Sequence, residues 1–105
     1  MSTPIVTVFR SRLRDERVPG YEETAAAMER RARAMPGFVD FATFTADDGE
    51  RVSVIVFASR EAHDAWRDDP HHRAAQRRGR DDWYAGYTIH VCEQVDVRAF
   101  TADPP

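Results

Sequence analysis

The sequence predicts an α+β fold of the ferredoxin-like type, in which the order βαββαβ builds a four-stranded antiparallel sheet with helices on one face. Three observations support this prediction. Four segments carry the β-branched and aromatic residues typical of strands, an amphipathic stripe lies between the first two, and a proline divides a second helix before the last strand. The 105 residues suffice for one domain, which we assign to residues 1–98; we expect the tail at 99–105 to be disordered.

The first strand and the first helix are each marked by a clear pattern. Residues 4–13, PIVTVFRSRL, are at first β-branched and aromatic and then alternate with arginine, as in a strand that runs from the core towards solvent. In residues 21–35 the apolar positions recur at spacings of four and three, which places them on one stripe of an amphipathic helix. Pro36 and Gly37 then end this helix, because proline cannot continue it and glycine accepts backbone angles that other residues avoid.

The next two strands are predicted to form a hairpin. Residues 38–45 and 51–58 are strand-like, and the sequence Asp-Asp-Gly at 47–49 between them is typical of a hairpin turn. The second of these strands is apolar on both faces over residues 54–57, so we expect both faces of the sheet to be covered. A chain this small has helices for only one face. The simplest cover for the other face is a second copy of the protein, and we therefore predict a homodimer.

The second helix is predicted to be broken. Ser59 is expected to cap a helix that ends near Trp66, and Asp69 and Pro70 mark a restart, with the aspartate as N-cap and the proline at the first helical position. A long final strand is expected over residues 84–98.

Side chains able to contact a ligand gather around this broken helix. His72 and Gln76 are four residues apart and so share one helix face, roughly one turn after a large aromatic residue. His90 and Cys92 share a face of the last strand, but no third ligand lies at a helpful spacing, so we expect no metal site. The other candidate ligand-contacting residues of this region are His63, Trp66, Arg73, Trp83 and Tyr84.

Charge and cysteine content exclude several classes of protein. The net charge of −3 offers no electrostatic case for binding nucleic acid or an anionic membrane. The single cysteine excludes an internal disulfide framework and fits a reducing compartment. The N-terminus lacks the pattern of a signal peptide, and no stretch approaches membrane-spanning length. We therefore expect a cytoplasmic protein.

Over nearly the whole chain, from Ile5 to Arg98, the sequence resembles the antibiotic biosynthesis monooxygenase (ABM) superfamily. The similarity rests on the order of the elements, the Pro-Gly-Phe at 36–38, the Asp-Gly hairpin, the segment SREAHDAW and a closing strand that ends in VCEQVDVR. It implies a dimeric α/β barrel, in which two sheets face each other and each subunit keeps a cleft between its sheet and its helices. Activities in this superfamily include cofactor-independent oxygenation of phenols and anthrones, haem degradation and quinol oxidation.

The resemblance implies a cofactor-independent monooxygenase that oxidises a small phenolic, anthrone-like or quinol metabolite with O2. Such an enzyme needs a base, donors aimed at the developing oxyanion and a dry apolar wall. His72 is the candidate base, and Gln76 or Arg73 the candidate oxyanion donor. Trp66 matches the pocket tryptophan of the quinone-forming and haem-degrading branches. The candidate wall residues are Phe9, Trp66, Trp83 and Tyr84.

Two alternatives stay open at the level of sequence. In the haem-degrading branch the iron-ligating histidine occupies the positions of Ala75 or Gln76, and the chain has no asparagine to match that family's catalytic asparagine. Haem binding would therefore need His72 as an unconventional ligand. The other alternative is a non-enzymatic dimeric module that binds a metabolite or serves as a stress or pathway accessory. On a purely structural interpretation, Trp66 packs in the core, and Trp83 and Tyr84 form a hydrophobic latch or dimer contacts.

Overall fold

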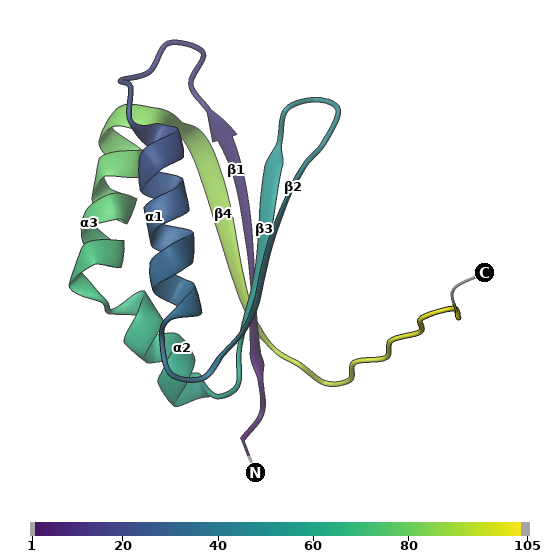
Figure 1. Cartoon of the computed structure of the whole chain (residues 1–105). Helices are drawn as coiled ribbons and strands as arrows, with labels where there is room; N and C mark the ends of the chain where they lie inside the picture. Colours follow the sequence, from purple (N-terminus) through teal and green to yellow (C-terminus); the bar gives the residue numbers. More distant parts are fainter. Residues whose placement is uncertain (1, 104–105) are drawn as a thin grey trace.

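The computed structural model describes residues 2–103 and confirms the predicted α+β fold. Its strands pair antiparallel in the order β2-β3-β1-β4. Figure 1 shows the helices on one side of this sheet. The elements are β1 (Ile5–Leu13), α1 (Tyr21–Arg33), β2 (Phe38–Thr45), β3 (Arg51–Phe57), α2 (Arg60–Arg67), α3 (Pro70–Arg78), the π-helix η1 (Gly79–Trp83) and β4 (Tyr84–Glu93).

The predicted helix boundaries are confirmed by their caps. The Ser59 hydroxyl accepts a hydrogen bond from the backbone N–H of Ala62 at 3.1 Å, which starts α2. The Asp69 carboxylate accepts hydrogen bonds from the backbone N–H groups of His71 and His72, both at 3.0 Å, and Pro70 follows as the first residue of α3. The break between the two helices therefore lies where the sequence places it.

The last strand is shorter than predicted. It ends at Glu93 rather than at residue 98. The neighbouring strand β1 begins at Ile5, and Ile5 pairs with Glu93. One further hydrogen bond follows, from the Gln94 N–H to the Pro4 carbonyl at 2.9 Å. The residues after Gln94 have no strand beside them to pair with. The segment 94–103 carries no regular secondary structure, and residues 104–105 of the predicted disordered tail lie outside the described residues.

The two faces of the sheet differ in what covers them. Successive side chains of a strand point to opposite faces, so Thr7 and Phe9 face the helices whereas Val6 and Val8 face away from them. On the helix side a small core joins α1, α2 and β3 through Ala32, Phe57 and Trp66, which are all buried. The other face has no helix over it within the described chain (Figure 1). Among residues 2–103, none of the helices combines the length and apolar character needed to cross a membrane.

Candidate functional site

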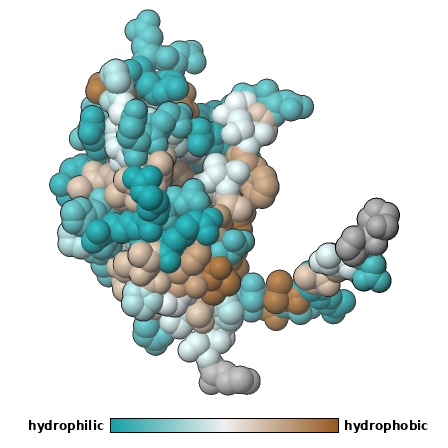
Figure 2. Space-filling view, in the orientation of Figure 1, coloured by the Kyte–Doolittle hydropathy of each residue, from teal (hydrophilic) through white to brown (hydrophobic). Residues whose placement is uncertain are grey.

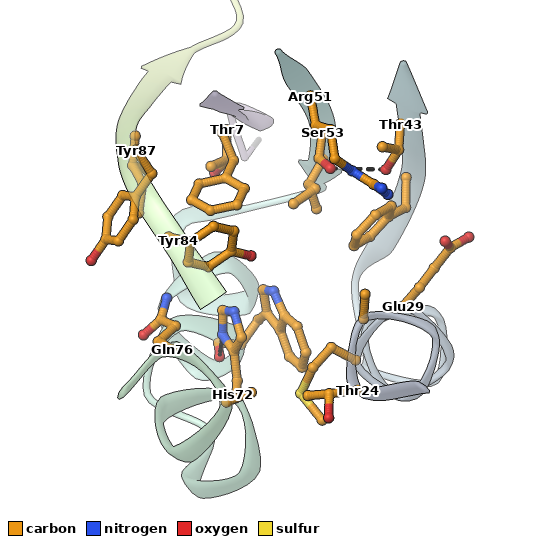
Figure 3. A pocket seen from close by; sticks show the side chains of 18 of the residues that line it. Thr7, Thr24, Glu29, Thr43, Arg51, Ser53, His72, Gln76, Tyr84 and Tyr87 are labelled. Atoms are coloured by element: carbon orange, nitrogen blue, oxygen red, sulfur yellow. Dashed lines mark hydrogen bonds between the residues drawn. The ribbon is translucent and has the colours of Figure 1, made fainter. Parts of the chain in front are cut away.

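A cleft of about 450 Å³ lies between the sheet and the helices. It lies beside the small core, and every helix and strand lines it with at least one side chain. Figure 3 shows His72 and Gln76 on one side of the cleft with Tyr84 beside them, and Arg51, Ser53 and Thr43 gathered on the sheet side. The volume and the mixed apolar and polar lining are those of a site for a small organic molecule.

Trp66 and His72 form a stacked pair at the helix break. Their ring centroids are 3.9 Å apart and their planes differ by 9°. Nδ1 of His72 lies 3.0 Å from the backbone carbonyl oxygen of Trp66, and since a carbonyl only accepts, Nδ1 donates. In the neutral ring the lone pair is therefore on Nε2. Burial lowers the pKa of His72 below its ordinary value of 6.5, against opposing contributions from that hydrogen bond and from Asp69, so the ring is neutral at neutral pH.

Asp69 fixes the start of α3, which carries this imidazole. Besides capping the helix, its carboxylate pairs with the Arg31 guanidinium of α1 through contacts of 2.8 and 2.9 Å. The hydrogen bond from Arg31 is the main reason that the pKa of Asp69 falls to about 2, and the backbone N–H groups of His71 and His72 add to it. One charged group thus joins α1 to the first turn of α3 and holds His72 in register with Trp66.

Four aromatic rings line the wall next to the imidazole. The Tyr84 ring centroid lies 5.6 Å from that of Phe9, 5.8 Å from Tyr21 and 5.7 Å from Tyr87. Burial, and then the neighbouring Tyr21, raise the pKa of Tyr84 well above its usual range, so its hydroxyl stays protonated. A Cβ at Gly79 in η1 would lie 2.5 Å from the Tyr84 ring, so only glycine at this position lets the ring take its place.

The strands β2 and β3 add a group of polar side chains to the cleft. The hydroxyl oxygens of Thr43 and Ser53 lie 2.8 Å apart, on neighbouring strands. Arg51 places its guanidinium carbon 5.4 Å from the centroid of the Tyr21 ring, and its nearest recorded carboxylate oxygen, on Glu22, is 3.9 Å away. The cleft therefore has an aromatic and imidazole part and a separate part with hydroxyls and a positive charge.

A family model described as antibiotic biosynthesis monooxygenase matches residues 4–78, well over half of the chain. The chain belongs to the antibiotic biosynthesis monooxygenase family. A relative, YqjZ of Bacillus subtilis (strain 168), is 33% identical over 97 residues, which cover 92% of this chain and 85% of YqjZ.

Two solved structures from other bacteria have the same fold. Rv0793 from Mycobacterium tuberculosis matches with a TM-score of 0.81 at 21% identity, over 92% of this chain and 100% of that one. SnoaB, a cofactor-independent oxygenase from Streptomyces nogalater, matches with a TM-score of 0.74 at 14% identity, over 91% of this chain and 97% of that one. At these identities the likeness shows the fold.

Within this ABM domain, seven of the eight predicted site residues line the cleft and one does not. Arg73 lies outside: its side chain is 63% exposed and faces Asp68 at 3.9 Å, because it points away from the face shared by His72 and Gln76. The residues that line the cleft as predicted are Phe9, His63, Trp66, His72, Gln76, Trp83 and Tyr84.

Three of these residues also have structural contacts, either a hydrogen bond or packing in the core. His63 has its Nδ1 2.8 Å from the Asp64 carboxylate. Trp83 is buried and donates its indole N–H to the Val18 carbonyl at 2.8 Å, so its polar atom is already bonded. Trp66 belongs to the core cluster and lines the cleft at once. In residues 2–103 no three His, Cys, Asp or Glu side chains come together as a metal site.

The sequence prediction missed the polar residues of the sheet. Arg51 and Ser53 occupy the same strand face as Ile55 and Phe57, and this alternation was visible in the sequence. Tyr21 was read as part of an apolar helix stripe. The pattern that indicates Arg51 and Ser53 is a polar side chain on the strand face that also carries core residues.

Proposed function

We propose that this protein is a cofactor-independent monooxygenase that oxidises a small aromatic metabolite, phenolic, anthrone-like or quinol, with O2. The observation that carries the proposal is the neutral imidazole of His72, which stacks on Trp66 and lines a cleft of about 450 Å³. Because Nδ1 carries the proton and donates it to the Trp66 carbonyl, the lone pair on Nε2 can accept a proton. A half-buried neutral imidazole beside an aromatic wall suits a base that removes a proton from a ring-bound carbon or hydroxyl.

The substrate supplies the electrons in this reaction. For an anthrone, Nε2 of His72 takes a proton from the CH2 group, and the resulting carbanion is oxidised by O2. One oxygen atom forms the new C=O bond, the second C–H bond breaks, and the other oxygen atom leaves as water with both hydrogens. The carbon is oxidised by four electrons, which reduce O2, so no external reductant is consumed.

The negative charge on the substrate oxygen needs hydrogen-bond donors. Tyr84 lines the cleft, and its hydroxyl, which is protonated at neutral pH, is a donor for that oxygen. The Gln76 side-chain amide also lines the cleft and shares the helix face of His72. We propose these two groups as the oxyanion donors, beside the aromatic wall of the cleft.

Replacement of His72 tests the proposal, with O2 uptake on 1,8-dihydroxyanthrone as the assay. We expect one O2 consumed for each quinone formed, and His72→Gln to lower kcat/KM by roughly 100-fold or more, since the base is lost. His71→Gln is the matched control: His71 is exposed and does not line the cleft, so its rate stays at the wild-type value. Equal rates for wild type and His72→Gln would contradict the proposal.

We also propose that the protein is a homodimer formed through the sheet face that no helix covers. Figure 2 shows hydrophobic residues along the sheet side of the molecule and again on the extended tail. Phe44 on β2 is 61% exposed, and in the tail Val95 is 97% exposed. A second copy would bury this surface, and burial of apolar area is the main driving force of such association.

Haem binding is the alternative that uses the same cleft. The neutral His72 has a lone pair for iron, and the positive charge of Arg51 suits a propionate. A haem there would supply iron-centred redox chemistry. Addition of haemin to the protein decides the matter: a shifted Soret band that disappears in His72→Gln supports haem, whereas an unchanged spectrum removes it.

A non-enzymatic ligand-binding module is the remaining alternative. It predicts that aromatic compounds bind in the cleft without any O2 uptake. Binding that persists in His72→Gln, together with a wild-type rate no higher than the uncatalysed oxidation, would favour it over the monooxygenase.

A further inference from the structure

We infer that the cleft takes an aromatic substrate that bears a carboxylate, and that Arg51 binds this carboxylate on the sheet side while the ring to be oxidised lies against Trp66 and His72. This inference rests on the proposed function, since it names the substrate class of the same cleft. Figure 3 shows Arg51 on the opposite side of the cleft from His72. Arg51 and His72 are thus placed to contact different parts of one ligand.

The charge of Arg51 is weakly paired. Its contact with Glu22 is 3.9 Å, and the Glu22 side chain is 70% exposed, so solvent screens the pair. The strand arginines on β1 are different: Arg10 contacts Glu50 at 2.8 Å and Arg12 contacts Asp48 at 2.7 Å. Arg51 can therefore exchange Glu22 for a ligand carboxylate at small cost.

Arg51 is also held in place to receive a ligand. Its side chain is 27% exposed and its guanidinium lies over the ring of Tyr21, a cation–π contact that keeps it on the cleft wall. The guanidinium is planar and has paired N–H groups, a geometry that matches the two oxygens of a carboxylate. The position of this group is thus set before a ligand arrives.

The hydroxyl pair beside Arg51 adds a neutral donor. Of Thr43 and Ser53, one hydroxyl donates to the other across 2.8 Å, and the second keeps its own proton for a ligand oxygen. The other carboxylate of this region, Glu29, is already paired with Arg33 at 3.0 Å. A ligand carboxylate therefore meets a positive charge and a hydroxyl donor, and Glu22 is its main competitor.

Binding of two matched probes tests the inference. Anthraquinone-2-carboxylate and anthraquinone-2-carboxamide have the same rings and differ in charge, and neither can be oxidised further at the ring carbonyl. Quenching of the tryptophan fluorescence reports the binding of each. We expect the wild-type protein to prefer the carboxylate, and Arg51→Gln to weaken carboxylate binding by roughly tenfold while the carboxamide changes little.

Two further variants separate ligand binding from folding. Glu22→Gln removes the competing carboxylate, so it strengthens binding of the carboxylate probe. Arg30→Gln is the control, because Arg30 is exposed on α1 and does not line the cleft, and it leaves both affinities unchanged. If the Arg51–Glu22 pair has only a structural role, the result differs. Arg51→Gln and Glu22→Gln then both lower the melting temperature, and the ratio of the carboxylate and carboxamide affinities stays at the wild-type value.

The probes do not react with O2, so the result is independent of the proposed oxygenation. A wild-type protein that binds both probes equally, or an Arg51→Gln variant that weakens both equally, overturns the role of Arg51 whatever the rate measurements give. Conversely, a lost carboxylate preference in Arg51→Gln supports the role of Arg51 even where His72→Gln leaves O2 uptake unchanged. The two proposals therefore fail separately.

Discussion

Among single residues, His72 is the proposed base, and its state of protonation decides whether it can act as one. Burial lowers its pKa below 6.5, so the neutral ring, with its lone pair on Nε2, is the form present at neutral pH. The protonated ring has no lone pair and cannot act as a base. Activity should accordingly be lost only in acid.

The pH dependence of the rate follows from this. We expect kcat/KM to be at its full value at neutral pH and to fall in acid with a midpoint below 6.5, the ordinary pKa of histidine. A rate profile of the wild-type protein measures the midpoint. A midpoint clearly above 6.5 would contradict the half-buried neutral imidazole of His72 as the base.

The lowered pKa of His72 also predicts a pH dependence of the folding stability. Because the folded pKa is lowered, the unfolded chain takes up this proton first as the pH falls through 6.5, so the folded state loses stability over that range. Above 6.5 the group has no effect. Urea unfolding of His72→Gln, compared with the wild-type protein and with His71→Gln, should show this slope missing from the first variant only.

The sequence predicted His72 as a residue of the cleft but not Arg51. The spacing of four residues placed His72 and Gln76 on one helix face, and the cleft lies there. The alternation of β3 places Arg51 on the strand face of Ile55 and Phe57, but its contact with the Tyr21 ring is set by tertiary packing and has no pattern in the sequence. Arg73 was chosen from a charged run, and such residues are most often exposed, as it is.

Among the elements, the start of α3 is the one that sets the position of His72. Asp69 both caps this helix and pairs with Arg31 of α1. The sequence motif of aspartate before proline predicted the cap. It could not predict the ion pair, which joins residues far apart in the chain. The π-helix η1 was also missed, because the widened turn at Gly79 and its close contact with Tyr84 have no pattern in a single sequence.

Two replacements separate the roles of Asp69. Asp69→Ala loses both the cap and the ion pair and should destabilise the protein by roughly 2 kcal/mol or more, whereas Asp69→Asn keeps a capping oxygen and should cost less. Urea unfolding measures both. Asp68→Ala is the control, because this exposed neighbour does not cap α3, and a change within about 0.5 kcal/mol is expected.

The pH dependence of Asp69 gives a second check. Its pKa is about 2 in the folded protein against 3.8 ordinarily, so its stabilising effect is complete above 3.8 and is lost as the pH falls towards 2. The difference in unfolding free energy between the wild-type protein and Asp69→Asn should therefore shrink below pH 3.8. A difference that stays constant would exclude the charge of Asp69 as the cause.

At the scale of the whole molecule, the prediction of the fold was correct because each level of the sequence agrees with it: strand composition, helix stripe, turn residues and caps. The end of β4 was wrong, since the length of a strand depends on its neighbour and not only on its own residues. The predicted dimer remains a prediction. It rests on the uncovered sheet face and the exposed apolar residues of the tail.

A charge on the uncovered face tests the dimer. Phe44→Asp places a carboxylate where the second copy would pack, so we expect a monomer by sedimentation analysis, with a melting temperature that no longer depends on protein concentration. Val18→Asp is the control, because this exposed valine lies in the β1–α1 connection, away from that face. A wild-type protein that sediments as a monomer would rule the dimer out.

The position of all the helices on one side of the sheet has a consequence for kinetics. In the proposed dimer the two sheets meet through their bare faces, so we expect both clefts on the outside of the assembly, each built from residues of a single chain. Turnover in one half then proceeds independently of the other. The rate should rise hyperbolically with substrate concentration, and a mixed pair with one inactive half should retain half of the full rate.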